Sequence, residues 1–502
     1  MNKPKPNILL ITTDSQRWDT LRCMGSAFAI SPNLDRLATA GVLFEQAHTS
    51  STVCSPARCS LMTGVHTPIH GCIENGINRL THFPVFPDLL KEQGYKNIMV
   101  GKTHFGPVPD SFDVQHIVTE KSSGANDAYA PFIKGHGYSR VSSDSNPVPE
   151  ELFMESFLVD TTISEIERVL AKEQGPFFAF CSMVSPHEPI DPPGKWACLF
   201  DDIVLPPINY MEGEINQFPE HLKRLLGLTE WTGEESQTNT NLVDLYEGNG
   251  KVYHKRFEEK VDRLRKLYYG LAAYCDAQIG RLIDYLDEKG IRENTLVIFS
   301  SDHGMQLFDH GFNDKHNFYD ATWRVPFIMS MPGTLPSGAK RDFAIWNDIP
   351  ATILAAAGTS CPTMQGFDLF TPLVNGKASP RRCAVATLYK SAAVATKRWK
   401  LEYYFEERRG RLFDRQADPL ETADLFDEPV YLEIRNELVV ALLNWRADIT
   451  DLKTLIDGTG GGGPVARRIS PHTKAMKGTD AESRLNDWAE AIDLKMMKET
   501  VK

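Results

Sequence analysis

The sequence lacks long hydrophobic runs and has no excess of positive charge. No apolar stretch approaches the roughly 18 residues of a membrane-spanning helix, and no apolar core of about 7–15 residues marks a secretory signal near the N-terminus. The 54 lysines and arginines are outnumbered by 66 aspartates and glutamates, which gives a formal net charge of −12. Binding to a nucleic-acid backbone usually needs a basic face. We therefore expect a cytoplasmic protein that binds neither a membrane nor nucleic acid.

The sequence also lacks regularly spaced pairs of cysteines. The nine cysteines are an odd number at irregular spacing, and no Cys-x-x-Cys pair suggests structural zinc. Secreted disulfide frameworks and zinc sites usually show regular pairs. We expect a reducing compartment, in which most of these thiols are small buried side chains.

Short apolar, β-prone runs alternate with amphipathic helical patterns through most of the chain. The runs that predict strands are 7–13, 42–47, 97–100, 177–184, 295–300 and 326–331, and the longest helical patterns are 152–171 and 264–288. This alternation predicts an α/β fold with a large, mostly parallel sheet flanked by helices. Ligands bind such sheets beyond the carboxyl ends of the strands, so the polar residues after each strand are the candidates for function.

Composition divides the chain into three predicted parts. Residues 1–375 form the catalytic α/β domain, with 188–260 as an insertion over one face, and 376–450 form a small antiparallel sheet with one helix. The tail 451–502 has a glycine-rich joint and a terminal helix. Because such a joint is flexible, our hypothesis is that the tail supports a homo-oligomer or closes a neighbour's active site.

Four clusters of reactive side chains stand out. The first is Cys54-Ser55-Pro56-Ala57-Arg58, followed by Ser60-Leu61-Met62-Thr63-Gly64; alone, the pentapeptide suits an ordinary helix start equally well. The others are Asp14 after the first strand, Lys102-Thr103-His104, and Asp302-His303-Gly304, which is followed by Lys315. Together, over roughly residues 7–445, they resemble the formylglycine-dependent sulfatases of the alkaline-phosphatase superfamily. That resemblance implies the fold expected above and the hydrolysis of sulfate monoesters.

The resemblance also assigns roles to individual residues. It implies that a formylglycine-generating enzyme oxidises Cys54 to an aldehyde, whose hydrate attacks sulfur with one hydroxyl and expels sulfate with the other. A plain thiol or serine would lack that second step. The implied catalytic residues are Cys54, Arg58, Lys102, His104, His187 and Lys315, and the implied metal ligands are Asp14, Cys54, Asp302 and His303. Calcium is the favoured ion, with Mn²⁺ and Mg²⁺ as alternatives.

Two positions depart from the family pattern. The family usually has two adjacent aspartates after the first strand, whereas this chain has Asp14-Ser15, so one anionic metal ligand is missing or supplied elsewhere. Thr103 stands where the family usually has tryptophan. On an extended segment Lys102 and His104 would point to the same side and Thr103 away from them, so the second departure matters less.

Two other functions remain open. A phosphonate monoester or phosphodiester hydrolase shares the nucleophile and the metal site but generally lacks the Lys-x-His pair. An inactive sulfatase-like binding protein would be expected to have lost some motif residues, and none is lost. The expected substrates are small aryl, alkyl or sugar sulfates. Asn75, His66, His70 and His310 are equally candidates for the mouth of the pocket and for plain surface.

Overall fold

The structure, a computed structural model, describes residues 5–120, 126–139, 146–172, 175–227, 252–253, 255–456 and 478–499. The chain forms two compact units. The first consists of Met1–Glu45, Gly94–Thr103 and Asp110–Arg341, and the second of Gln46–Gln93, His104–Pro109 and Asp342–Lys502. The domain borders predicted at 375 and 450 divide the chain differently and stay a prediction.

An eight-stranded sheet is the centre of the first unit. Its strand order is β4-β3-β5-β1-β6-β7-β2-β8. The strands from β4 to β6 are parallel, and β7 is antiparallel to both β6 and β2. The bounds are β1 Asn7–Thr13, β2 Val42–His48, β3 Lys96–Lys102, β4 Val114–Val118, β5 Phe177–Ser182, β6 Thr295–Ser301, β7 Phe327–Ser330 and β8 Ala339–Ile345. The mostly parallel sheet predicted from the sequence is confirmed; β4 and β8 were not predicted.

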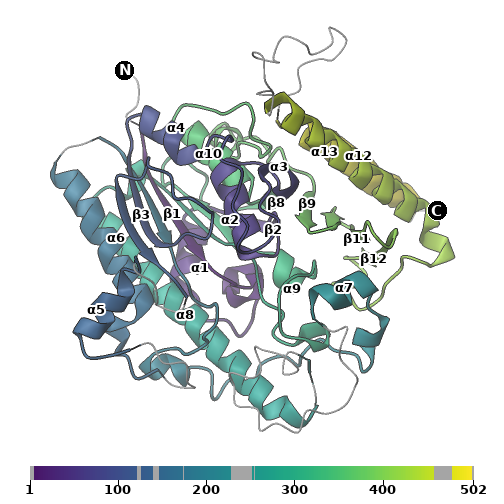
Figure 1. Cartoon of the computed structure of the whole chain (residues 1–502), viewed down its shortest axis with the longest axis horizontal. Helices are drawn as coiled ribbons and strands as arrows, with labels where there is room; N and C mark the ends of the chain where they lie inside the picture. The colour runs from purple at the N-terminus through teal and green to yellow at the C-terminus, as the bar shows by residue number, and fades with distance from the viewer. Residues whose placement is uncertain are drawn as a thin grey trace. The chain divides into compact units, whose positions relative to one another are not determined.

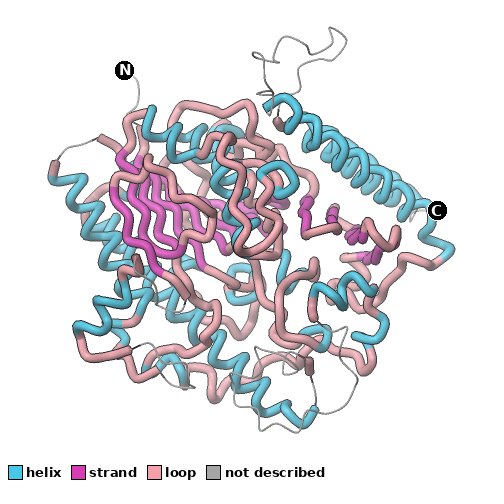
Figure 2. Tube along the Cα trace, in the orientation of Figure 1, coloured by secondary structure: helices cyan, strands magenta, loops and turns pink. Residues whose placement is uncertain are grey.

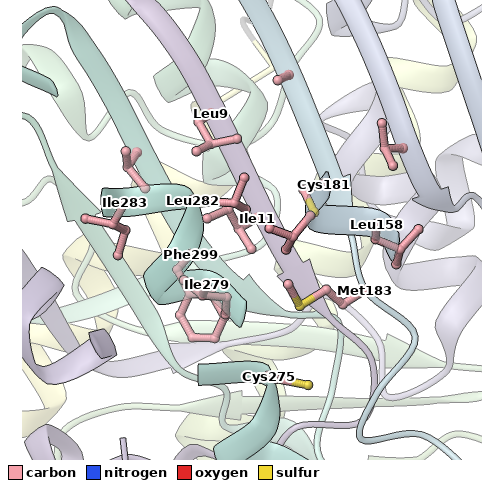
Figure 3. Packing of buried hydrophobic residues seen from close by; sticks show 14 of the residues in the cluster. Leu9, Ile11, Leu158, Cys181, Met183, Cys275, Ile279, Leu282, Ile283 and Phe299 are labelled. Carbon is pink, nitrogen blue, oxygen red and sulfur yellow. The ribbon is translucent and has the colours of Figure 1, made fainter. Parts of the chain in front are cut away.

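Three helices cover one face of this sheet (Figure 1). They are α1 (Pro32–Thr39), α6 (Met154–Ala171) and α8 (Glu258–Glu288). Figure 3 shows Leu9 and Ile11 of β1 packed beside Ile279 and Leu282 of α8, within one buried cluster. Every residue of β1 is buried, as expected for a strand inside a parallel sheet. This packing fixes the strand ends from which the polar site is built.

The parallel strands lie side by side (Figure 2). Because all five run in the same direction, their carboxyl ends meet at one edge of the sheet. Register places Lys102 opposite Val118 and Thr13 opposite Ser301. The residues that end or follow these strands are Lys102 on β3, Glu120 after β4, His187 after β5, Asp14 after β1 and Asp302 after β6. Asp14 and Asp302, which are 288 positions apart in the sequence (302 − 14), therefore meet at one edge.

The second unit has a four-stranded antiparallel sheet and two long helices. The strand order is β12-β11-β10-β9, so the predicted antiparallel C-terminal part is confirmed. The strands are β9 Ala384–Leu388, β10 Ser391–Ala395, β11 Trp399–Tyr404 and β12 Arg409–Asp414, and the helices are α12 Leu432–Ile456 and α13 Asp480–Glu499. The remaining helices of this unit are α2 Cys54–Thr63, α3 Thr67–His70, α4 Phe86–Glu92, α10 Asp348–Ala356 and α11 Phe370–Val374.

Other short helices complete the first unit. They are α5 Tyr129–Gly135, α7 Glu220–Leu225 and α9 Asp320–Trp323, with 3-10 turns at Trp18–Thr20, Arg22–Met24, Glu150–Leu152, Gly194–Ala197, Glu214–Gln217, Lys255–Phe257, Arg292–Asn294 and Asp309–Gly311; a further turn in the second unit is Pro429–Tyr431. The predicted insertion 188–260 contains α7 and three of these turns. Among the residues described in either unit, no helix is long and apolar enough to cross a membrane.

The terminal helix α13 packs along α12 inside its own unit (Figure 1). Its Glu482 is fully buried and accepts hydrogen bonds from Arg381 Nη1 at 2.7 Å and Trp445 Nε1 at 2.7 Å, while His66 Nε2 lies 2.9 Å away. Arg381 also pairs through two nitrogens with buried Asp348. The helix is thus part of a core, whereas the glycine-rich joint lies outside the described residues. The homo-oligomer stays a prediction.

The buried Glu482 predicts a pH dependence of stability. Burial alone would raise the pKa of this carboxyl, but Arg381 and His66 outweigh it and lower the pKa from 4.5 to about 2. A carboxyl with a lowered folded-state pKa stabilises the fold above its unfolded pKa and loses that contribution as pH falls. We expect wild type to exceed Glu482→Gln in unfolding free energy at pH 7, with the difference shrinking between pH 4.5 and pH 2. Urea titrations across this range measure it; a constant difference would contradict the assignment.

Candidate active site

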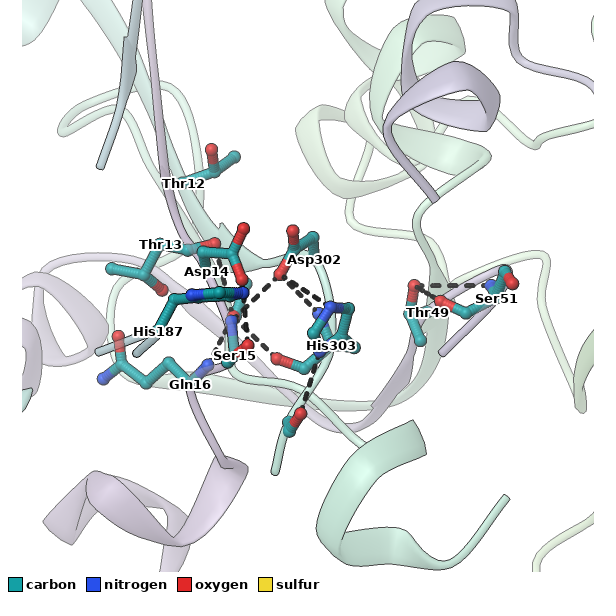
Figure 4. Close-up of polar contacts among 12 residues, drawn as sticks. Thr12, Thr13, Asp14, Ser15, Gln16, Thr49, Ser51, His187, Asp302 and His303 are labelled. Carbon is teal, nitrogen blue, oxygen red and sulfur yellow. Dashed lines mark hydrogen bonds and ion pairs between the residues drawn. The ribbon is translucent and has the colours of Figure 1, made fainter. Parts of the chain in front are cut away.

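Asp14 lies at the carboxyl end of β1 with no exposed surface. The next residue, Ser15, has a left-handed backbone with φ of 61°. This turn lets Ser15 Oγ donate to Asp14 Oδ1 at 2.9 Å and Ser15 N–H donate to Asp302 Oδ1 at 3.1 Å. Figure 4 shows these contacts between the two strand ends. At the position where the family has a second carboxylate, this chain therefore has Ser15, whose two donors orient the carboxylates of Asp14 and Asp302.

Asp302 and His303 follow β6 and are fully buried. His303 Nδ1 lies 2.8 Å from the Gly304 carbonyl oxygen. A carbonyl oxygen can only accept, so Nδ1 carries the proton and Nε2 presents a lone pair. This is the usual arrangement of a histidine that binds a metal through Nε2.

The ligand atoms of Asp14, Asp302 and His303 lie within 4.8 Å of one another. Two buried carboxylates this close repel each other unless a positive charge lies between or beside them. Two oxygens and an imidazole nitrogen suit a hard divalent cation such as Ca²⁺, Mg²⁺ or Mn²⁺. The residues present therefore fit the metal that the resemblance implies.

Lys102, the last residue of β3, reaches into this cluster. It is 1% exposed, and its Nζ lies 2.5 Å from Asp14 Oδ2. A second ion pair joins Nζ to Glu120 Oε1. A buried ammonium needs such partners, because an unpaired charge away from water is costly.

His187 lies beside Asp14 in the loop after β5 (Figure 4). Its Nδ1 is 2.8 Å from the Glu188 carbonyl oxygen and 3.2 Å from the Glu188 carboxylate. Burial and the Lys315 ammonium lower the pKa of His187, but the Glu188 and Asp14 carboxylates outweigh them and raise it to about 9. These two carboxylates therefore favour the protonated form of the ring.

Cys54 and Arg58 belong to the second unit. Cys54 is the first residue of α2, and Arg58 follows one turn later on the same helix face. Both are buried, at 1% and 0% exposure. Ser55 N–H, in the first turn, donates to Asn75 Oδ1 at 3.0 Å. The helix thus begins at the predicted nucleophile, where the helix dipole favours negative charge.

His104 belongs to the second unit, and Lys102 to the first. β3 ends at Lys102, and His104 has a left-handed φ of 50°. The alternation of side chains along an extended strand therefore does not reach His104, so strand geometry does not support the expectation that its side chain points to the same side as that of Lys102, and this expectation stays a prediction. The catalytic role of His104 stays a prediction.

The histidines considered for the pocket mouth are all buried. His66, His70 and His310 are at most 3% exposed. His70 accepts from Cys72 N–H through Nδ1 and contacts Ser60 Oγ through Nε2 at 3.0 Å, and burial first, then His66, lowers its pKa to about 3. His310 Nδ1 contacts Glu214 in the first unit. These rings support the structure locally.

Three residues with a clear place in the site were missed by sequence reasoning. Ser15 was interpreted only as the position of an anionic ligand that is missing or supplied elsewhere, although it donates to two carboxylates. Glu188 pairs with His187, and Glu120 pairs with Lys102. Recognising β4 as a strand would have placed Glu120 at the same edge as the motif residues.

Comparison with known proteins identifies the family. The sulfatase family model matches residues 6–359, and the model of the C-terminal region of N-sulphoglucosamine sulphohydrolase matches residues 308–448. An arylsulfatase of Clostridium perfringens (strain 13 / Type A) is 28% identical over 497 residues, covering 90% of this chain and 98% of that relative.

Two solved structures share the fold. One, in complex with its substrate D-glucosamine-2-N,6-O-disulfate, has a TM-score of 0.72 at 21% identity and covers 90% of this chain and 98% of its own. The phosphonate monoester hydrolase of Agrobacterium radiobacter has a TM-score of 0.74 at 23% identity and covers 88% and 96%. Since the sulfatase model spans well over half of the sequence, this chain belongs to the sulfatase family of hydrolases, in the alkaline-phosphatase superfamily.

Proposed function

We propose that the protein cleaves small sulfate monoesters, with aryl, alkyl or sugar leaving groups, at the strand-end site. The observation that carries this proposal is the buried cluster of Asp14, Asp302 and His303, with their ligand atoms within 4.8 Å and Lys102 paired to Asp14. A substrate oxyanion needs this combination of fixed positive charge and cation ligands. Family membership supplies the reaction.

The proposed metal ligands are Asp14, Asp302 and His303, completed by residue 54. Calcium is the ion we favour, because carboxylate oxygens dominate the set; Mn²⁺ and Mg²⁺ are the alternatives. When bound, the cation supplies positive charge next to the sulfate oxygens. Its identity is testable by elemental analysis of the purified protein.

Cys54 is the proposed source of formylglycine, made by a formylglycine-generating enzyme. In that form, residue 54 supplies a hydrated aldehyde as the attacking group and as the group that later releases sulfate. Support comes from its motif, shared with the family, and from its buried place at the first turn of α2. Mass spectrometry of the Cys54 peptide tests this directly: the aldehyde lowers the mass by the difference between –CH₂SH and –CHO. Active protein with an unchanged cysteine would refute the assignment.

The chain's own cationic side chains bind and orient the sulfate group in this proposal. Arg58, Lys102 and Lys315 offer donors to its oxygens, and fixed charges of this kind stabilise the transition state without rearranging. As the S–O bond to the leaving group breaks, that oxygen takes a proton from His187. His104 is proposed to contact the hydroxyl of residue 54 during sulfate release.

His187→Gln should slow hydrolysis most for poor leaving groups. An alkoxide needs a proton far more than a stabilised phenolate does, so we expect a loss of about 10²–10⁴-fold in kcat with an alkyl sulfate and a much smaller loss with 4-nitrophenyl sulfate. Steady-state kinetics with both esters measure this contrast. Equal losses on the two substrates would argue against proton donation by His187.

A phosphonate monoester or phosphodiester hydrolase is the second candidate, favoured by the similarity in fold to the Agrobacterium enzyme. We rank it lower because Lys102 and His104 are both present. A panel of sulfate, phosphonate and phosphodiester substrates of one leaving group separates the two functions. Higher kcat/KM on the phosphonate would reverse the ranking. Cytoplasmic location and homo-oligomeric state stay predictions.

A further inference from the structure

Lys102 is held between two carboxylates on opposite sides of its strand. The sheet order β4-β3-β5-β1 places Glu120, which follows β4, on one side of β3, and Asp14, which follows β1, on the other. Lys102 Nζ pairs with both carboxylates. Lys102 and Asp14 are buried, at 1% and 0% side-chain exposure, whereas Glu120 is 17% exposed.

The contact with Asp14 conflicts with the proposed metal site. Asp14 Oδ2, which accepts from Lys102 at 2.5 Å, belongs to a carboxylate proposed to bind a divalent cation. An ammonium at that distance competes for the same oxygens and repels a cation bound beside them, strongly so in a buried site. Lys102 needs a second anionic partner in order to remain charged and ordered when Asp14 binds the cation.

We propose that Glu120 is a positioning residue that draws the Lys102 ammonium away from Asp14 and holds it ready for the sulfate group. This inference rests on the proposed function of the site. Strand register supports it, because Lys102 lies opposite Val118 and Glu120 follows only two residues later. The same register keeps Glu120 one strand beyond Lys102, on the side away from the cation ligands.

Replacing Glu120 by glutamine preserves the size of the side chain and removes its charge. In this variant, Asp14 binds the Lys102 ammonium more strongly than the neutral glutamine does. Lys102 therefore stays paired with Asp14, the proposed cation ligand. We expect Glu120→Gln to weaken calcium binding and to raise KM for a sulfate ester more than it lowers kcat. Glu120→Asp keeps the charge and should restore part of both losses.

A double-mutant cycle separates positioning from simple loss of a nearby negative charge. Calcium affinity is measured by competition with a chelating dye, without substrate, in wild type, Glu120→Gln, Lys102→Met and the double variant. Through-space attraction between Glu120 and the cation acts in both backgrounds, whereas competition from Lys102 acts only when Lys102 is present. We expect Glu120→Gln to weaken binding by about tenfold with Lys102 present and by no more than about twofold in the Lys102→Met background.

Equal losses in the two backgrounds would overturn the inference while leaving the proposed function intact. Conversely, an unchanged KM for the sulfate ester in Lys102→Met would remove Lys102 from the proposed mechanism, whatever the calcium cycle shows. If none of the four proteins bound calcium, both the inference and the calcium assignment would be overturned. Glu165→Gln is the matched control: Glu165 pairs with His116 on β4 and with Arg168, away from the cluster, and its loss should not change calcium affinity.

Discussion

Cys54→Ala will abolish hydrolysis of sulfate esters while the protein remains folded. Alanine lacks the thiol that must be oxidised to give the proposed aldehyde, so no attacking group can be made at residue 54, and loss of a nucleophile typically costs at least about a thousandfold in kcat. The smaller side chain fits the space of the buried thiol at the start of α2. Turnover of 4-nitrophenyl sulfate gives the rate, and circular dichroism melting gives the fold.

The matched control is Cys198→Ala, which removes an exposed thiol from the same chain. Its activity and Tm should equal those of the wild type. If Cys54→Ala kept most of the activity, residue 54 would not be the nucleophile, whichever metal occupies the site. A loss of activity accompanied by an equal loss of folded protein would point to a structural role for Cys54.

Glu482→Ala should strongly destabilise the second unit. It leaves Arg381 and His66 buried beside an empty position, and breaking a buried ion pair by removing one partner costs about 3–5 kcal/mol. Trp445 Nε1 also loses its acceptor. Chemical denaturation at pH 7 should show this cost as a lower midpoint.

Glu490→Ala is the control in the same helix, because Glu490 is exposed. Surface substitutions of this kind usually change stability by less than about 0.5 kcal/mol. A similar small effect for Glu482→Ala would mean that α13 contributes little to the core. The prediction would then be wrong even if both variants remained active.

Strong local patterns made much of the fold predictable. The apolar run before Asp14 and the run before Asp302 each read as a buried parallel strand, and the structure has them as neighbours, β1 and β6. Strand ends then located the reactive side chains, because parallel strands end at one edge. β4 was missed because Val114–Val118 mixes polar with apolar residues at the edge of the sheet. Because Glu120 follows this strand, its place near the site was missed as well.

Contacts between distant segments could not be predicted. Nothing near Glu482 in the sequence indicates that it meets Arg381 and His66, 101 and 416 residues away. The sequence therefore predicted the tail to be a separate, flexible segment, not part of a core. Ser15 is a similar case: its hydroxyl looks like a lost ligand until the left-handed turn brings it onto Asp14.

The discontinuous second unit has a consequence for biosynthesis. Residues 46–93 belong to one compact unit with the described residues 342–456 and 478–499, so α2 cannot reach its final surroundings until the C-terminal segment has left the ribosome. More than 400 residues follow Cys54, and translation at about 5–20 residues per second takes roughly 20–90 s to complete them. Because the thiol is only 1% exposed in the folded protein, a modifying enzyme of the kind proposed would reach it more easily before α2 packs. We therefore expect nascent chains to be oxidised readily at Cys54 and refolded cysteine-form protein to be a poor substrate, which a comparison of the two in vitro would measure.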